Sequence, residues 1–337
     1  MTVDRIEPIE HGGDLDAARR RYPAAPEPWI DLSTGINPHA YPFASPATGY
    51  WQHLPQRSAE LALRAAAAVR YGAPDADNIA AAPGTQALIQ LLPRLLDPTE
   101  VAVLAPTYAE HALCWARAGH RVTERATLAD IGTAGIVVAV NPNNPTGARI
   151  APGDLATLAA KLAEKDGLLV VDEAFADFTP EQSLVPRRLP RTVVLRSFGK
   201  AYGLAGLRLG FAVAQVPFAR RLRAELGPWP VSGPALAIGT AALGDSVWIA
   251  AMGDKLAVAC GRLDGLLTAA GFTVLGGTHL FRLAEHRHAR HVADALGRDG
   301  IHVRQFAAHP AWLRFGLPGA EPAWQRLACA LGAAARS

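Results

Sequence analysis

Residues 168–175 read LLVVDEAF, and residues 192–200 read TVVLRSFGK. Each segment begins with a short run of apolar residues and ends in charged or polar ones. An uninterrupted apolar run of this length is typical of a strand buried on both faces of a parallel sheet. Because the ligands of such sheets gather at the carboxyl ends of the strands, Asp172 and Lys200 lie where chemistry is expected.

The same alternation of strand and helix extends outward from these two segments. Further strands are expected over residues 101–104, 136–140 and 207–214, and helices over residues 58–70, 85–96, 109–118 and 155–164. Short strands separated by longer helices indicate right-handed crossovers. The sequence therefore predicts an α/β fold with a mainly parallel sheet that is covered on both faces.

The pattern changes after about residue 220. A long helical region is expected over 235–269, followed by strands over 272–275, 279–283, 301–303 and 312–315 and helices over 289–297 and 322–334. Residues 1–40 show no period and are expected to form an irregular arm that packs with the small domain and the active site. The large domain is then expected over 41–224, and a small α+β C-terminal domain over 225–337.

Composition excludes several classes of protein. Of the 337 residues, 50% are hydrophobic and 19% charged, which excludes a mainly disordered chain. The net charge of +3 argues against a nucleic-acid partner. The absence of a long apolar run or a signal-peptide pattern argues against a membrane protein. Three scattered cysteines suit neither a disulfide framework nor a zinc site, so we expect a cytoplasmic protein.

Lysine is rare, which limits the candidates for an amine nucleophile. The chain has four lysines, of which Lys161 and Lys165 lie four residues apart on an expected helix and Lys255 lies in another helical stretch. Helix-face lysines are typically solvated. Lys200 follows a strand and precedes several glycines, so it is the candidate for catalysis, although the pattern alone also allows a structural lysine.

Two turns carry further candidates. Residues 141–147 read NPNNPTG, a rigid turn that can hold an amide side chain over a ligand. Residues 83–86 read PGTQ at an expected helix start, where free backbone N–H groups can bind a phosphate. Taken singly, both patterns are also compatible with ordinary turns.

Together, NNPTG at 143–147, DEAF at 172–175 and SFGK at 197–200 with Arg208 resemble the pyridoxal-phosphate enzymes of the aspartate-aminotransferase fold. The resemblance covers the chain from about residue 58 to its end and is to fold type I, class I/II. It implies a large domain with a mainly parallel sheet plus a small α+β C-terminal domain. It also implies pyridoxal 5'-phosphate as the cofactor.

The resemblance assigns roles to residues at matching positions. Lys200 is implied to hold the cofactor covalently and then to transfer protons, and Asp172 is implied to pair with the protonated pyridine nitrogen. Asn144 is implied to donate to the phenolate oxygen of the cofactor, and Tyr108 to stack on its ring. The implied phosphate ligands are Gly84, Thr85, Gln86, Ser197 and Arg208.

The N-terminal region narrows the resemblance. HGG at 11–13 and DLSTGINP at 31–38 are similar to the opening of threonine-phosphate decarboxylases of cobalamin biosynthesis. This similarity implies decarboxylation of L-threonine O-3-phosphate to (R)-1-amino-2-propanol O-2-phosphate. The substrate contacts are expected at Arg314, which would bind the carboxylate, and at His11, Asn37 and Arg304. Histidinol-phosphate aminotransferases are the alternative, and a cofactor-binding regulator without turnover is a third reading.

Some positions depart from the family pattern. Phe175 stands where many members have a tyrosine that donates to the phenolate oxygen, and Leu54 stands where an aromatic residue is usual. Ser232 likewise replaces a more typical asparagine. We further expect a homodimer whose active sites are each completed by the other chain. We expect no metal site, because His288 and His291 suit a polar helix start.

Overall fold

The computed structural model of the protein describes residues 11–334 and divides them into two units. The larger unit comprises Ile36–Cys260 and Gly276–Leu280, and the smaller one contains the N-terminal residues up to Gly35 and two C-terminal segments. Residues 225–260, which were expected in the C-terminal domain, lie in the larger unit. The reason is the packing of α9 (Gly233–Gly244) on α3 (Arg57–Tyr71).

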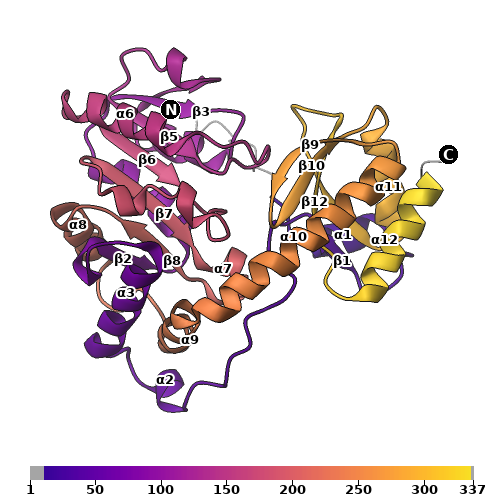
Figure 1. The fold of residues 1–337 in the computed structure, drawn as a ribbon, viewed down its shortest axis with the longest axis horizontal. Helices are drawn as coiled ribbons and strands as arrows, with labels where there is room; N and C mark the ends of the chain where they lie inside the picture. The colour runs from indigo at the N-terminus through magenta and orange to yellow at the C-terminus, as the bar shows by residue number, and fades with distance from the viewer. Residues whose placement is uncertain (1–10, 335–337) are drawn as a thin grey trace, which may run out of the picture. The chain divides into compact units, whose positions relative to one another are not determined.

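A seven-stranded sheet forms the centre of the larger unit, in the order β2-β8-β7-β6-β5-β3-β4 (Figure 1). Strands β3 to β7 run parallel, whereas β8 is antiparallel to both of its neighbours. The predicted α/β class with a mainly parallel sheet is thereby confirmed. The strands are β2 (Ile79–Ala82), β3 (Glu100–Leu104), β4 (Arg121–Arg125), β5 (Ile136–Val140), β6 (Leu168–Asp172), β7 (Thr192–Ser197) and β8 (Gly210–Val213).

Two strands of this sheet were not predicted. Strand β2 is an Ile-Ala-Ala-Ala run, whose small residues carry little strand signal. Strand β4 lies at the sheet edge and has mostly exposed side chains, so it lacks an apolar run. The strand expected over 207–214 is shorter, because Leu207 ends a 3-10 turn and Arg208 adopts a left-handed conformation.

The helices of the larger unit differ from expectation at two places. The helix expected over 85–96 is α-helical only as far as Leu91, and a 3-10 turn follows at Leu92–Leu95 because Pro93 has no N–H to donate. The helical region expected over 235–269 is broken near Asp245, where α9 and α10 meet at 76°. The remaining helices are α2 (Gly49–Gln52), α4 (Thr85–Leu91), α5 (Glu110–Arg117), α6 (Pro152–Ala163), α7 (Phe198–Ala201), α8 (Val216–Leu226) and α10 (Ser246–Ala269).

No single described helix is long and apolar enough to cross a membrane; α9 and α10 pass such a test only as a bent pair.

The alternation of side chains across the sheet divides the core into two layers. In β5, Ile136 and Val138 pack on the side of α4, α5 and α8, whereas Val137 and Ala139 pack on the side of α3, α6 and α9. Strands β6 and β7 alternate in the same way. Continuing this period of two, Asp172 and Ser197 face the α4–α5 side, and Glu173 and Arg196 face the opposite side.

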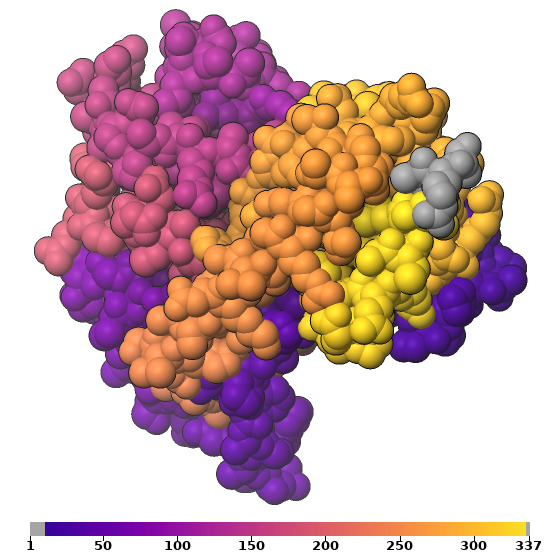
Figure 2. All heavy atoms as spheres, turned by 45° about the vertical axis from the view of Figure 1, so that its right-hand side comes forward, coloured from indigo at the N-terminus to yellow at the C-terminus, as the bar shows by residue number. Residues whose placement is uncertain are grey.

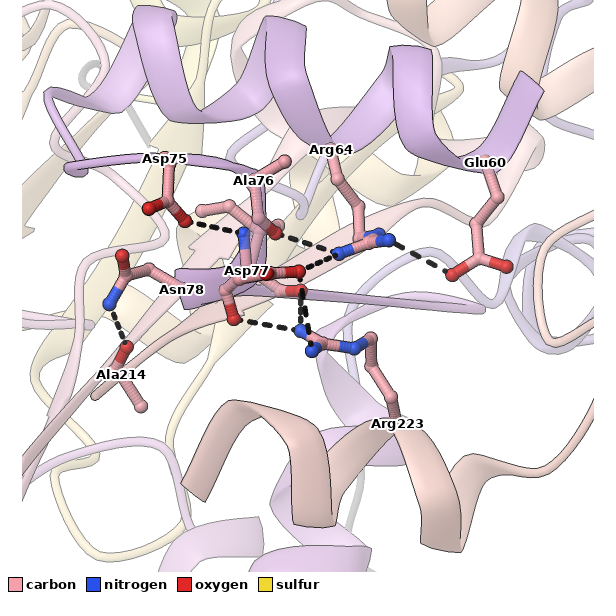
Figure 3. Close-up of polar contacts among 9 residues, drawn as sticks. Glu60, Arg64, Asp75, Ala76, Asp77, Asn78, Ala214 and Arg223 are labelled. Atoms are coloured by element: carbon pink, nitrogen blue, oxygen red, sulfur yellow. Dashed lines mark hydrogen bonds and ion pairs between the residues drawn. The ribbon is translucent and has the colours of Figure 1, made fainter. Parts of the chain in front are cut away.

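The turn that leads into β2 is clamped between two helices (Figure 3). From α3, Arg64 donates to the carbonyl of Ala76 at 2.8 Å and lies 3.4 Å from the Asp77 carboxylate. From α8, Arg223 donates to the carbonyls of Asp77 and Ile79 at 2.9 and 2.8 Å. These bonds satisfy backbone oxygens at the start of β2 and so fix the strand that leads to the Gly84 turn.

The smaller unit contains the sheet β1-β11-β12-β10-β9, with α1, α11 and α12. Residues 1–40 were expected to form an irregular arm, but the described part of this region, from residue 11, contains a helix and a strand. Asp14 caps α1 by accepting the Ala17 N–H at 2.8 Å, and β1 pairs in parallel with β11. The elements are α1 (Leu15–Arg21), β1 (Ile30–Leu32), β9 (Thr273–Thr278), β10 (Phe281–Glu285), α11 (Ala289–Arg298), β11 (Ile301–Gln305), β12 (Trp312–Gly316) and α12 (Glu321–Ala334).

Candidate active site

The candidate residues of the larger unit line up at the side of its sheet where the parallel strands end. The parallel strands β5, β6 and β7 end there, and the antiparallel β8 begins there. The loops at this edge therefore follow the sheet order, with Asn144 after β5, Asp172 ending β6, Ser197 ending β7 and Arg208 before β8. Gly84, which follows β2, is the last residue in this row. Because β2 pairs antiparallel with β8, the end of β2 lies beside the start of β8.

Asp172 is almost fully buried, at 4% exposure, and is held by two hydrogen bonds. Its Oδ1 accepts the Ala174 N–H at 3.0 Å, and its Oδ2 lies 3.0 Å from His111 Nε2. His111 lies in the first turn of α5 and is 1% exposed. The sequence analysis missed His111, although its place three residues after Tyr108 at a helix start was an available signal.

A chain of hydrogen bonds fixes the hydroxyl of Tyr108. The Tyr108 hydroxyl donates to Gln86 Oε1 at 3.1 Å, and Gln86 Nε2 donates to Glu110 Oε2 at 2.9 Å. Because a carboxylate only accepts, the Gln86 amide has one orientation. Burial raises the pKa of Tyr108, and the charge of Glu110 raises it further, so the phenol stays protonated. Tyr108 is thus a fixed neutral ring at the sheet edge.

Gly84, Arg208 and Ser197 form a possible phosphate cradle. A Cβ on Gly84 would lie 2.6 Å from Arg208 Nη2, so only glycine lets the guanidinium approach this turn. Arg208 has a φ of 53°, a conformation that non-glycine residues rarely adopt and that is often found at functional sites. Ser197 caps α7 without a side-chain hydrogen bond to the helix. These three groups can bind an anion with backbone N–H, hydroxyl and guanidinium donors.

Lys200 lies in the short helix α7, directly after β7. Its Nζ is 5.1 Å from the centre of the buried Phe175 ring. The buried residue Asn37 holds this turn by two hydrogen bonds. Its N–H donates to the Lys200 carbonyl at 2.9 Å, and its Nδ2 donates to the Ala201 carbonyl at 2.8 Å. Asn37 was predicted to contact the substrate; in the structure its hydrogen bonds position the backbone of Lys200.

The three asparagines in the turn after β5 have two different roles. Asn141 exchanges hydrogen bonds with the backbone of Ile150 at 3.1 and 2.9 Å. Asn143 donates to the Pro106 carbonyl and accepts from the Thr107 hydroxyl, which ties this turn to the segment that carries Tyr108. Asn141 and Asn143 therefore build the loop, and Asn144 remains the candidate for contact with a cofactor.

Behind the site, on the other face of the sheet, lies a buried ion cluster. Arg196 is 2.8 Å from the Glu173 carboxylate and 3.1 Å from that of Asp177, and its guanidinium lies over the Tyr71 ring. Each partner is nearly inaccessible to solvent. The cluster joins the ends of β6 and β7 and therefore supports Asp172 and Ser197, which are the neighbours of Glu173 and Arg196 in sequence.

Two arginines stand opposite each other in the smaller unit. Arg304 of β11 pairs with Arg314 of β12 in the antiparallel register. Burial lowers the pKa of Arg314 to about 10, and the positive charge of Arg304 contributes to this shift. Like charges on directly opposite strand positions are destabilising, so this arrangement suits an anionic ligand.

His11 and Arg304 line the same cavity of about 480 Å³ in the smaller unit. The cavity lies among α1, α11 and β11, and further polar lining comes from Asp14 and His302. The structure thus brings together two of the residues predicted to bind the substrate, and Arg314 lies beside Arg304 on the same sheet.

Comparison with known proteins shows which family the chain resembles as a whole. The family model described as "Aminotransferase class I and II" matches residues 44–330. Threonine-phosphate decarboxylase of Pseudomonas aeruginosa is 44% identical over 330 residues, covering 96% of this chain and 97% of that protein. Another protein of that name, from Sinorhizobium sp., is 44% identical over 337 residues, with 96% and 98% covered.

The fold also has solved relatives. Histidinol-phosphate aminotransferase from Sinorhizobium meliloti, solved in complex with pyridoxal-5'-phosphate, superimposes with a TM-score of 0.79. The match covers 99% of this chain and 98% of the other, at 23% sequence identity.

Proposed function

The chain belongs to the class I and II aminotransferase family, and within it we propose that the protein converts L-threonine O-3-phosphate to (R)-1-amino-2-propanol O-2-phosphate and CO2. The observation that carries this proposal is the 44% identity to two threonine-phosphate decarboxylases over nearly the whole chain. The product belongs to cobalamin biosynthesis.

Pyridoxal 5'-phosphate is the cofactor, and the residues at the sheet edge fit it. A buried carboxylate, Asp172, stands two strands from Arg208, the cation that lies against the Gly84 turn. Lys200, directly after β7, lies between them in the sheet order. This row suits a molecule with a ring nitrogen at one end and a phosphate at the other. Bound there, the cofactor supplies an electron sink for the pair left at the substrate Cα.

Each residue around the cofactor has a role that follows from the chemistry of its side chain or backbone. Asp172, fixed by His111, keeps a proton on the ring nitrogen through a buried ion pair. Tyr108, whose hydroxyl is held by a hydrogen bond to Gln86, would hold the ring by packing against it. Lys200 anchors the cofactor and delivers a proton to the carbon from which CO2 has left. Ser197, Arg208 and the backbone of Gly84, Thr85 and Gln86 bind the phosphate of the cofactor.

Substrate selection depends on the smaller unit. Arg314 binds the substrate carboxylate, and its fork of N–H donors matches both carboxylate oxygens. Arg304 and His11, which share one cavity, bind the substrate phosphate. The two opposed arginines concentrate positive charge, which favours a substrate that carries two anionic groups.

The function is tested by a paired assay on the holoenzyme. One reaction contains threonine phosphate and the other contains histidinol phosphate with 2-oxoglutarate; CO2 is measured in the first and glutamate in the second. We expect CO2 without glutamate. Glutamate formation without CO2 would instead support the alternative, a histidinol-phosphate aminotransferase.

The protein is further proposed to act as a homodimer. Large apolar side chains are exposed along residues 43–54, namely Phe43, Tyr50, Trp51 and Leu54, with exposures of 40–64%. This segment, around α2, lies at the surface of the larger unit (Figure 2). Exposed aromatic residues gathered on one segment are typical of an interface, and a second copy of the chain is the partner proposed here.

A charge placed on this surface should dissociate the dimer. We expect the native protein to sediment as a dimer at assay concentrations and Trp51→Glu to sediment as a monomer, because a carboxylate cannot be buried there without a partner. Val258→Glu is the matched control, since Val258 is 76% exposed on α10, away from residues 43–54 in sequence. A native protein that is monomeric and active would contradict the proposal.

A further inference from the structure

Ser33 joins the N-terminal HGG turn to the arginine proposed to bind the substrate carboxylate. Ser33 is fully buried. Its hydroxyl accepts the Gly13 N–H at 2.7 Å, and its carbonyl accepts a bond of 2.7 Å from Arg314 Nη2. One residue therefore contacts both the turn that follows His11 and the guanidinium of Arg314.

Asp31 determines where the proton of the Ser33 hydroxyl points. The Asp31 carboxylate accepts the Ser33 N–H at 2.8 Å and the Ser33 hydroxyl at 2.5 Å. Because a carboxylate has no proton to give, the Ser33 hydroxyl must donate to it. A lone pair of the hydroxyl oxygen then faces the Gly13 N–H. Alanine at position 33 would remove this link but leave the carbonyl bond to Arg314.

The two glycines of the HGG motif are required by the same contact. A Cβ on Gly12 would lie 2.4 Å from the Ser33 carbonyl oxygen, so no side chain fits there. Gly13 has a φ of +93°, which side chains rarely tolerate. The HGG turn therefore packs directly against Ser33. This packing places His11 at the cavity that His11 and Arg304 both line.

We infer that Ser33 is a positioning residue that holds the phosphate-binding His11 turn at a set distance from the carboxylate-binding Arg314. This inference rests on the proposed function and deepens it. A fixed separation between the two anchors selects amino acids with a phosphate close to the carboxylate, which is the class to which threonine phosphate belongs. Longer phosphorylated amines without a carboxylate do not match both anchors.

The test compares Ser33→Ala with Thr34→Val. Both changes remove a hydroxyl that donates to Asp31; the Thr34 Oγ1 to Asp31 Oδ2 distance is 3.3 Å. Only the Ser33 hydroxyl also accepts a hydrogen bond from the Gly13 N–H. For Ser33→Ala, we expect kcat/KM for threonine phosphate to fall at least about tenfold, mainly through KM, because a buried hydrogen bond to the turn is lost. The value for L-threonine, which lacks the phosphate, should change about twofold or less, as should both values for Thr34→Val.

Combining His11→Ala with Ser33→Ala gives a second functional readout. If Ser33 acts through the His11 turn, the double variant should lose little more than His11→Ala alone. Equal losses for threonine phosphate and L-threonine, or additive losses in the double variant, would overturn the coupling.

Hydrogen exchange of the holoenzyme tests the contact without turnover. The Gly13 amide should exchange at least about tenfold faster in Ser33→Ala than in the native protein, and at the native rate in Thr34→Val. Unchanged protection in Ser33→Ala would overturn the hydrogen bond itself. If the native enzyme releases no CO2 from threonine phosphate, the proposed function fails and the substrate coupling fails with it, while the exchange result still decides the Gly13–Ser33 link.

Discussion

Replacing Lys200 with alanine should abolish turnover and covalent attachment of the cofactor. We expect kcat to fall by about 10⁴-fold or more, because the anchoring amine and the proton donor are lost together. The absorption band of the lysine-bound cofactor should disappear, and borohydride should no longer fix the cofactor to the protein. Both readouts are measured on purified protein reconstituted with excess pyridoxal 5'-phosphate.

Lys255→Ala is the matched control, because Lys255 is an exposed lysine on α10. It should keep native activity and the native spectrum. Peptide mapping of the borohydride-reduced native protein should find the label on Lys200. A label on Lys255 would show that the wrong lysine has been assigned.

Replacing Asp172 with asparagine should cause the second largest loss. An amide keeps the shape and can still bond to His111, but it carries no charge to hold a proton on the ring nitrogen. Removing one such buried electrostatic contact typically costs about 10²–10³-fold in kcat. We also expect weaker cofactor binding, measured by titration of the apoprotein.

Asp154→Asn, an exposed carboxylate in the first turn of α6, provides the control for an Asp-to-Asn change. Its kcat and cofactor affinity should stay near the native values. An Asp172→Asn enzyme that keeps kcat within about threefold of the native value would contradict the role given to this carboxylate, since that is far below the loss expected for a buried ion pair.

The strands and turns that carry the catalytic residues could be predicted because their signals are local. The apolar runs of β5, β6 and β7 are interpretable without the rest of the chain, and each ends in its polar residues. The face that each polar residue occupies was not predicted. In the structure, the alternation of side chains in β6 and β7 puts Asp172 and Ser197 on one face of the sheet and brings Glu173 and Arg196 together on the other. Arg196 at the end of a buried apolar run was an available signal for that cluster.

The contacts that the sequence did not reveal join residues distant in the chain. His111 bonds to Asp172 from 61 positions away, and Ser33 meets Arg314 across 281 positions. Both residues lie in segments with local signals, His111 at a helix start and Ser33 in the DLSTGINP motif, but no local signal identifies a partner so far along the chain. A buried histidine or serine is usually a satisfied core residue. The break at Asp245 was missed for a different reason, since both flanking helices have strong helical patterns and only tertiary packing separates them.

Carbon labelling in D2O tests the central claim most directly. The holoenzyme is incubated in D2O with L-threonine O-3-phosphate labelled with ¹³C at the carboxylate, in the presence of 2-oxoglutarate, and the products are analysed by mass spectrometry. We predict labelled CO2 and 1-amino-2-propanol phosphate with one solvent deuterium on the carbon that bore the carboxylate, delivered there by Lys200. A labelled 2-oxo acid that retains its carboxylate, formed together with glutamate, would contradict the account.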